Sequence, residues 1–279
     1  MMQGRPRISL LHATYRRAGG PLEIQDAWLG RAVDPGSVEY VLSMDADDAA
    51  TVALTEDVPR LVNPSLGGAV TAVRNWNAAA AAAKGDLLVV IADDLFPPQG
   101  WDRAIIDMIG GLNPARTRFV VKLADSPRSG DVHLRHPVVS RAFYAKFGLF
   151  SPSYQGVYCD DDFTARAFWR SVILDGRSLR LEHRHPGLSE KITRSESHDR
   201  INRREEYERG RAQFVAEWSP RKRMAKRQLV PTGSAETLSH RGLAVTQRKL
   251  RASSNGHYAI RRFRSAPRSL WVRCVPSHR

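Results

Sequence analysis

Acidic residues stand in a pair at the point where an apolar segment ends. Asp93 and Asp94 follow the apolar residues 87–91 after one alanine, and two prolines come shortly after them, at 97 and 98. Adjacent carboxylates repel each other unless a cation or solvent relieves them. Hard oxygen ligands suit Mg²⁺ or Mn²⁺, which often bridge substrate phosphates. The pair indicates a metal–diphosphate site, and a solvated turn is an equally good explanation of these two residues taken alone.

A second acidic cluster contains Asp45, Asp47 and Asp48 and follows the strand-like segment 38–44. A carboxylate in this position can accept hydrogen bonds from a ribose or a base. A turn or a helix cap is the simpler interpretation of the cluster on its own. The ligand-binding interpretation gains from the other acidic strand end, because the two are predicted to share one region of the fold.

Three consecutive carboxylates, Asp160 to Asp162, head a segment with helical spacing. Interaction with the helix dipole would explain one or two of them. Three exceed that need, and mutual repulsion or partial burial would raise the pKa of one carboxyl toward the range of a useful general base.

Two histidines flank Arg184 near the end of an alternating segment. The side chains of His183 and His185 would point to the same side of a strand, so one of them is a candidate metal ligand. An ordinary pair of histidines at a turn is the alternative. The spacing of cysteine and histidine does not fit a zinc site.

Segments with strand and helix patterns alternate along the chain, which predicts a doubly wound α/β sheet. In such sheets ligands bind outside the carboxyl ends of the strands, so the acidic strand ends should share one crevice. The predicted strands are 7–14, 38–44, 61–62, 87–91, 119–123 and 179–185, and the predicted helices are 21–33, 69–84, 101–109, 160–169 and 200–218. Residues 138–147 are predicted as a strand that turns into a helix.

The net charge of +14 comes from one part of the 279-residue chain. Residues 219–279 hold 15 Lys and Arg against one acid, Glu236, while residues 1–218 hold 28 bases and 28 acids. The last segment is also rich in Ser and poor in periodic apolar residues, which predicts a mostly disordered basic tail after a folded domain of residues 1–218. The charge therefore says little about the folded domain.

The sequence lacks the motifs that are typical of several protein classes. The chain has no Walker A loop and no Gly-rich dinucleotide fingerprint. No apolar run approaches the roughly 20 residues of a membrane span, and the start lacks the apolar segment of a signal peptide. Only two cysteines are present, which favours a reducing compartment. We expect a cytoplasmic protein, with contact between the basic tail and a membrane surface as one alternative.

The residues also carry a family resemblance. The chain resembles family 2 glycosyltransferases with the GT-A fold, whose Rossmann-like mixed sheet fits the predicted alternation. The resemblance covers about residues 7–190, and its most specific part is the block with Asn75 and Asn77 on a helix, Lys84-Gly85-Asp86, an apolar strand and the pair Asp93-Asp94. The other matching segments are residues 8–17, 40–48 and 158–166.

The resemblance implies roles for individual residues. Asp160 would be the catalytic base, with Asp161 as the neighbouring alternative. Asp93 and Asp94 would form the metal-binding "DXD" element, although Ile91 and Ala92 stand where many members have its first acid. His183 or His185 would complete the metal site. The nucleotide-sugar would contact Thr14, Tyr15, Arg17, Asp45, Asp47, Asp48, Asn77 and Asp93.

Together these features predict a glycosyltransferase that depends on Mn²⁺ or Mg²⁺ and inverts the configuration of the transferred sugar. The family suggests a uridine diphosphate sugar as donor, while the acceptor, a glycan, lipid or protein, stays open. One competing hypothesis is a nucleic-acid-binding protein acting through the basic tail. Others are a nucleotidyltransferase, or an inactive fold that only binds sugar nucleotides. No structural nucleic acid is expected.

Overall fold

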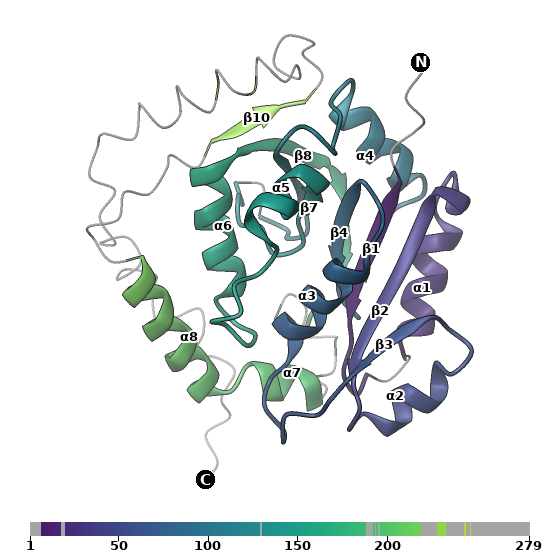
Figure 1. Ribbon diagram of the computed structural model, residues 1–279, viewed down its shortest axis with the longest axis vertical. Coiled ribbons are helices and arrows are strands. Elements are labelled where there is room, and N and C mark those ends of the chain that lie inside the picture. Colours follow the sequence, from purple (N-terminus) through teal and green to yellow (C-terminus); the bar gives the residue numbers. More distant parts are fainter. Residues whose placement is uncertain are drawn as a thin grey trace.

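The protein folds around one central eight-stranded sheet, with strand order β10-β8-β6-β7-β4-β1-β2-β3 (Figure 1). The computed structural model describes residues 7–17, 20–128, 130–187, 192, 194, 196–218, 228–232, 243 and 246. The strands of this sheet are β1 (Ile8–Ala13), β2 (Val38–Asp45), β3 (Arg60–Asn63), β4 (Leu87–Ile91), β6 (Phe119–Ala124), β7 (Val138–Ser140), β8 (Val172–Arg180) and β10 (Leu229–Pro231).

The sheet is mixed but mostly parallel, which confirms the predicted fold class. Only β7 runs antiparallel to its neighbours, β4 and β6. All other paired strands of this sheet run parallel. A small second sheet pairs β5 (Leu95–Phe96) with β9 (Glu182–His183) in antiparallel fashion. Because β1, β2 and β4 run parallel in adjacent positions, their carboxyl ends meet at one edge.

Helices cover both faces of the sheet because successive strand residues point to opposite sides. In β4, Leu87, Val89 and Ile91 join one hydrophobic cluster, and Leu88 and Val90 join the other. The first cluster includes residues of α1 (Gly20–Gly30) and α4 (Trp101–Ile109); the second includes residues of α3 (Ala72–Ala82), α5 (Arg141–Phe147), α6 (Cys159–Arg170) and α8 (Arg204–Glu217). The remaining helices are η1 (Pro35–Ser37), α2 (Ala49–Leu54) and α7 (Glu196–Ile201).

Some predicted boundaries differ from the structure. The segment predicted as one helix over 200–218 is divided into α7 and α8 at Asn202 and Arg203. The strand predicted over 179–185 is the end of β8 followed by β9. Within the range predicted as a tail, β10 pairs with β8 in the main sheet, so this short segment belongs to the fold. Residues 219–227, 233–242, 244–245 and 247–279, the rest of that range, lie outside the described residues.

Two tryptophans connect α1 and α4 on one face of the sheet. The rings of Trp28 and Trp101 pack edge to face with centroids 4.9 Å apart, and neither side chain is exposed. The indole of Trp101 donates to the carbonyl of Trp28 at 2.8 Å, and that of Trp28 donates to the carbonyl of Leu95 at 2.8 Å. Both indole N–H groups are therefore satisfied inside the core, as burial requires.

None of the helices in the described part of the chain is both long and apolar enough to cross a membrane.

The tryptophan pair gives a direct test of the core. We expect Trp28→Ala to lower the free energy of unfolding by about 3–5 kcal/mol, because the change leaves a large cavity and removes one buried hydrogen bond. Chemical denaturation measures this. The control is Val33→Ala, at a side chain that is mostly exposed, for which a change within about 0.5 kcal/mol is expected. Equal effects of the two variants would contradict the packing described here.

Candidate functional site

Asp93 lies at the edge where β1 and β4 end together. Its Oδ1 accepts a hydrogen bond from Thr14 Oγ1 at 2.8 Å and lies 3.0 Å from Nε2 of His12. His12 is fully buried and pairs in register with Ile91 of β4. The other ring nitrogen of His12 contacts the hydroxyl of Tyr40. The structure therefore brings Thr14 and Asp93 together as expected, and His12 of β1 contacts the same carboxylate oxygen of Asp93.

Asp94 lies under a group of histidines from the second half of the chain. Its side chain is buried, with 6% of the residue exposed. One carboxylate oxygen lies 3.5 Å from Nε2 of His183 and the other lies 3.4 Å from Nε2 of His198. The backbone carbonyl of Asp94 accepts a hydrogen bond from the backbone N–H of Arg184 at 2.7 Å, which ties the end of β4 to the segment that follows β9.

The histidines decide the charge of Asp94. Burial by itself would raise the pKa of this carboxyl, but the contacts with His183 and His198 outweigh burial and hold the pKa well below its usual range. The pKa of His183 is raised, because Asp94 outweighs the burial that opposes its protonation. Burial lowers the pKa of His185 to about 4, so His185 is neutral at pH 7, the form that ligates metals.

Asp94, His185 and His198 fit a divalent cation. One potential ligand atom from each of them lies within 4.8 Å of the others. One ionised carboxylate and two imidazoles suit a first-row metal such as Mn²⁺. Of the two predicted histidines, His185 joins this group, while His183 directs Nδ1 to the carbonyl of Asp125 at 3.0 Å. Among the described residues Asp93 does not belong to this group of potential ligands, and its Oδ1 contacts Thr14 and His12 instead.

The acidic cluster after β2 separates into residues with different surroundings. Asp45 is 1% exposed and accepts hydrogen bonds from Thr71, Arg74 and Asn75 of the segment that starts α3. Asp48 caps α2 by accepting from the N–H of Thr51 at 3.3 Å. Both carboxylates are buried and bonded within the fold, and the contact of Asp45 or Asp48 with a nucleotide stays a prediction.

Asp47 is the acid of this cluster that keeps an open acceptor. Its Oδ2 lies 3.5 Å from the hydroxyl of Tyr15. Its Oδ1 is buried and has no hydrogen-bond partner among the residues that the structure describes. An unsatisfied buried acceptor is costly, so this oxygen is suited to accept a hydrogen bond from a ligand donor.

Helix α7 packs over the loop that follows β1, a contact that the sequence pattern did not indicate. Its buried Arg200 places its guanidinium 3.9 Å from the centroid of the Tyr15 ring and donates to the carbonyls of Gly68 and Ala69. His198 contacts Arg17 through Nδ1, at 3.1 Å from Nη1. The helix thus carries a potential metal ligand and a cation that packs on the predicted nucleotide-binding loop.

Asn77 contacts a neighbouring loop, and its predicted contact with the nucleotide-sugar stays a prediction. Its side chain donates to the carbonyl of Phe150 at 2.9 Å and accepts from the backbone N–H of Phe150 at 3.1 Å. The side-chain amide is therefore used to fix the loop before α6. The asparagine of α3 that faces the strand ends is Asn75, two residues earlier, which bonds Asp45 and lies near Ser43.

Asp160, at the start of α6, forms a pair with a histidine. The Nε2 atom of His133 lies 2.7 Å from Oδ2 of Asp160, and its Nδ1 lies 4.0 Å from Asp161. The predicted rise of a carboxyl pKa is wrong here. Burial raises the pKa of Asp160, but His133 outweighs it and lowers the pKa. In return Asp160 outweighs the burial of His133 and raises the pKa of the imidazole.

Asp125 begins the loop after β6, which contacts the surroundings of both Asp94 and Asp160. Its carboxylate lies 3.1 Å from Nδ1 of His136 and contacts the ammonium of Lys122. Lys122 is only 2% exposed, and its other acidic neighbour is Asp131 at 3.9 Å. A buried ammonium without its anion is strongly unfavourable, so the pair with Lys122 holds Asp125 in place at the end of β6. The backbone carbonyl of Asp125 in turn contacts Nδ1 of His183.

Comparison by sequence finds no matching family model and no matching curated protein. Comparison by structure finds S. aureus TarS, residues 1–349, with a TM-score of 0.50 and 12% identity, over 76% of this chain and 72% of that chain. The same protein in complex with UDP-GlcNAc aligns with a TM-score of 0.46 and 13% identity, over 58% of this chain. The alignment spans 53% of that chain, about half its length. The similarity shows a glycosyltransferase fold without singling out family 2.

The acid-stability of the fold should depend on Asp125. Burial opposes ionisation of this carboxyl, but His136 and Lys122 lower its pKa below the ordinary value. The unfolded chain therefore binds a proton first as the pH falls below about 4, and folding loses free energy from there downward.

We expect Asp125→Asn to lower the free energy of unfolding at pH 7 by about 3–5 kcal/mol, because it leaves Lys122 without its closest anion. Below pH 4 the free energy of unfolding of this variant should decrease less steeply than that of the wild type. Denaturation curves between pH 3 and 7 measure both effects. Asp107→Asn is the control, since Asp107 is exposed in a surface pair with Arg103. A variant as stable as the control would contradict the role of the buried pair.

Proposed function

We propose that this protein is a metal-dependent, inverting glycosyltransferase of the family 2 type, which moves a sugar from a nucleotide diphosphate to an acceptor hydroxyl. The observation that carries the proposal is the buried Asp94 carboxylate, held ionised beside His185 and His198 at the carboxyl edge of the sheet. The glycosyltransferase fold agrees with it. The open acceptor of Asp47 beside Tyr15 supplies a second contact at the same edge.

The nucleotide would lie against the loop that follows β1. Tyr15 offers an aromatic face, although Arg200 already packs on one side of the ring. Asp47 offers an unsatisfied carboxylate oxygen for a ribose hydroxyl or a base N–H. Arg17, at the end of this loop, offers a cation near His198 for a phosphate oxygen. We propose a uridine diphosphate sugar as donor, following the family resemblance.

The diphosphate would lie beside Asp94. A divalent cation held there by Asp94, His185 and His198 would neutralise the charge that develops on the leaving diphosphate. The chain's own contribution is to keep Asp94 ionised and His185 neutral, which are the protonation states that ligation requires. Asp93, fixed by Thr14 and His12, would hold the loop end in place.

Asp160 would act as the general base, with Asp161 as the neighbouring alternative. The acceptor oxygen forms a bond to the anomeric carbon while its proton passes to the carboxylate. The bond from that carbon to the diphosphate oxygen breaks, and the electron pair leaves with the diphosphate. Attack from the opposite face inverts the configuration. His133 keeps Asp160 ionised and oriented before the reaction.

Metal-dependent nucleotide binding tests the first part. We expect wild-type protein to bind UDP with Mn²⁺ and much more weakly with a chelator, in a titration followed by calorimetry. Asp94→Ala and His198→Ala should each weaken Mn²⁺-dependent binding by about tenfold or more, because each removes one ligand. Asp107→Ala, at an exposed acid of α4, is the matched control. Binding of UDP that ignores both Mn²⁺ and Asp94 would contradict the metal assignment.

Turnover tests the second part. We expect Asp160→Asn to reduce sugar transfer by about 10²–10⁴-fold while UDP binding stays unchanged, because the amide cannot accept the proton. His133→Gln should give a smaller loss that depends on pH. Release of UDP, rather than pyrophosphate, separates this activity from a nucleotidyltransferase. Transfer by Asp160→Asn within a few-fold of wild type would remove Asp160 as the base.

A further inference from the structure

A break in the register between β6 and β8 opens a cavity at the edge of the sheet. Leu123 pairs with Gly176, but the next residue, Ala124, pairs with Arg180. Residues 177–179 therefore bulge out of the ladder. Gly176 permits the close approach before the bulge, since a Cβ there would meet Val121 at 2.5 Å.

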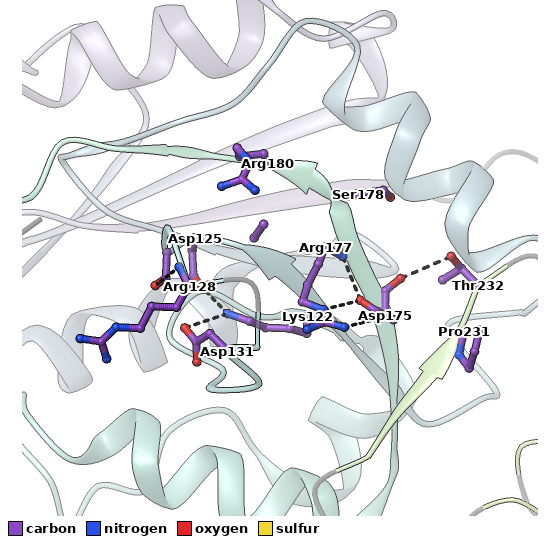
Figure 2. Close-up of a pocket in the computed structure, with 12 residues that line it drawn as sticks. Lys122, Asp125, Arg128, Asp131, Asp175, Arg177, Ser178, Arg180, Pro231 and Thr232 are labelled. Atoms are coloured by element: carbon purple, nitrogen blue, oxygen red, sulfur yellow. Dashed lines mark hydrogen bonds and ion pairs between the residues drawn. The ribbon is translucent and has the colours of Figure 1, made fainter. Parts of the chain in front are cut away.

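The cavity has a volume of about 390 Å³ and lies between the ends of β6, β8 and β10 (Figure 2). This volume falls in the range of small-molecule sites, about 300–1,000 Å³. Four bases and three acids line it, and these are Lys122, Arg128, Arg177, Arg180, Asp125, Asp131 and Asp175.

Two of the four bases are already neutralised. Lys122 contacts Asp125, and Arg177 makes a two-point contact with Asp175 at 2.7 and 2.8 Å. Arg128 and Arg180 are exposed, and the guanidinium of neither contacts a carboxylate among the residues that the structure describes. The third acid of the lining, Asp131, pairs with Arg135, which lies outside the lining. Arg128 and Arg180 are therefore left as two uncompensated cations, which suit a phosphate or carboxylate group.

Two residues that line the cavity contact histidines of the proposed reaction centre. Asp125 lines the cavity, and its backbone carbonyl accepts from Nδ1 of His183, which faces Asp94. Asp131 also lines the cavity and accepts from the backbone N–H of His133 at 2.9 Å. His133 is the partner of Asp160. A molecule in the cavity would thus lie next to the loop that contacts His183, the neighbour of Asp94, and that contains His133, the partner of Asp160.

We propose that this cavity binds the acceptor, and that the acceptor carries an anionic group, a phosphate or a carboxylate, held by Arg128 and Arg180. The identity of the bound molecule as the acceptor rests on the proposed function. The binding of an anion by these two arginines does not, so the two statements can be tested separately.

The experiment measures binding of small probes to the full chain by calorimetry, without nucleotide. The probes are glucose 6-phosphate, glucuronate and glucose, so that the phosphate, the carboxylate and the neutral sugar are compared. We expect an anionic probe to bind more tightly than glucose. Arg128→Gln and Arg180→Gln should each weaken its binding by about fivefold, as loss of one exposed charge pair does, and the double variant should weaken it more.

Arg103→Gln is the matched control, since it removes an exposed arginine from α4 and should leave probe binding unchanged. UDP binding with Mn²⁺ should be the same in wild type and in the double variant. Loss of UDP binding in the double variant would overturn the proposal, because the cavity would then belong to the donor. Equal binding of the anionic probes by wild type and the double variant would also overturn it.

Failure of the proposed function has a different signature. If wild type bound glucose 6-phosphate through Arg128 and Arg180 but did not bind UDP, the donor assignment would fall and the anion site would be supported. If wild type bound UDP but bound glucose as tightly as both anionic probes, the donor assignment would be supported and the inference on the acceptor would fall. Thermal unfolding of each variant checks that the two exposed positions leave the fold intact.

Discussion

The candidate site depends on one constraint. Strand β4 is buried on both faces, and two carboxylates, Asp93 and Asp94, follow its end. All five residues of β4 are buried, so the strand cannot shift to bring its end into solvent without exposing the core. Asp93 and Asp94 follow this strand and are enclosed by the elements around it. A buried carboxylate remains charged only when nearby donors or cations replace water. The structure answers this need with histidines.

Four acids of the region contact a histidine. His12 contacts Asp93, His183 and His198 contact Asp94, and His12 lies far in sequence from the other two. The same arrangement recurs at Asp125 with His136 and at Asp160 with His133. Histidine is suited to this task because its proton is exchangeable near neutral pH. The arrangement thus combines stabilisation of the acids with groups that can exchange a proton or bind a metal.

The fold was predictable from the sequence because its determinants are local. Alternation of apolar segments with Gly, Pro and Asp at their ends marks the strands, and the five apolar residues of β4 left little choice. The strand-end acids were predictable for the same reason. Their individual surroundings were not, since Asp45 and Asp48 differ from Asp47 only through contacts made in the folded chain.

Other surroundings at the site have the same tertiary origin. Asn75 and Asn77 are two residues apart on α3, where a two-residue step turns a side chain by more than half a circle, so which of them faces the strand ends depends on helix phase. His198 could not be paired with Asp94 from spacing, because 104 residues separate them. The rise in pKa predicted for one carboxyl of Asp160 to Asp162 does not occur at Asp160, because His133, 27 residues earlier in sequence, lowers its pKa. These contacts are tertiary and have no local signature.

In the proposed metal site, helix α7 would supply a ligand in place of the first acid of the metal-binding element that the family resemblance implies. Ile91 stands in the buried end of β4, and its carbonyl accepts from the indole of Trp76 at 3.0 Å, so this position faces the core and offers no ligand. The missing ligation would come from His185 and from His198 on α7. The same helix packs Arg200 on Tyr15. One short helix therefore contributes both to the proposed nucleotide pocket and to the proposed metal centre.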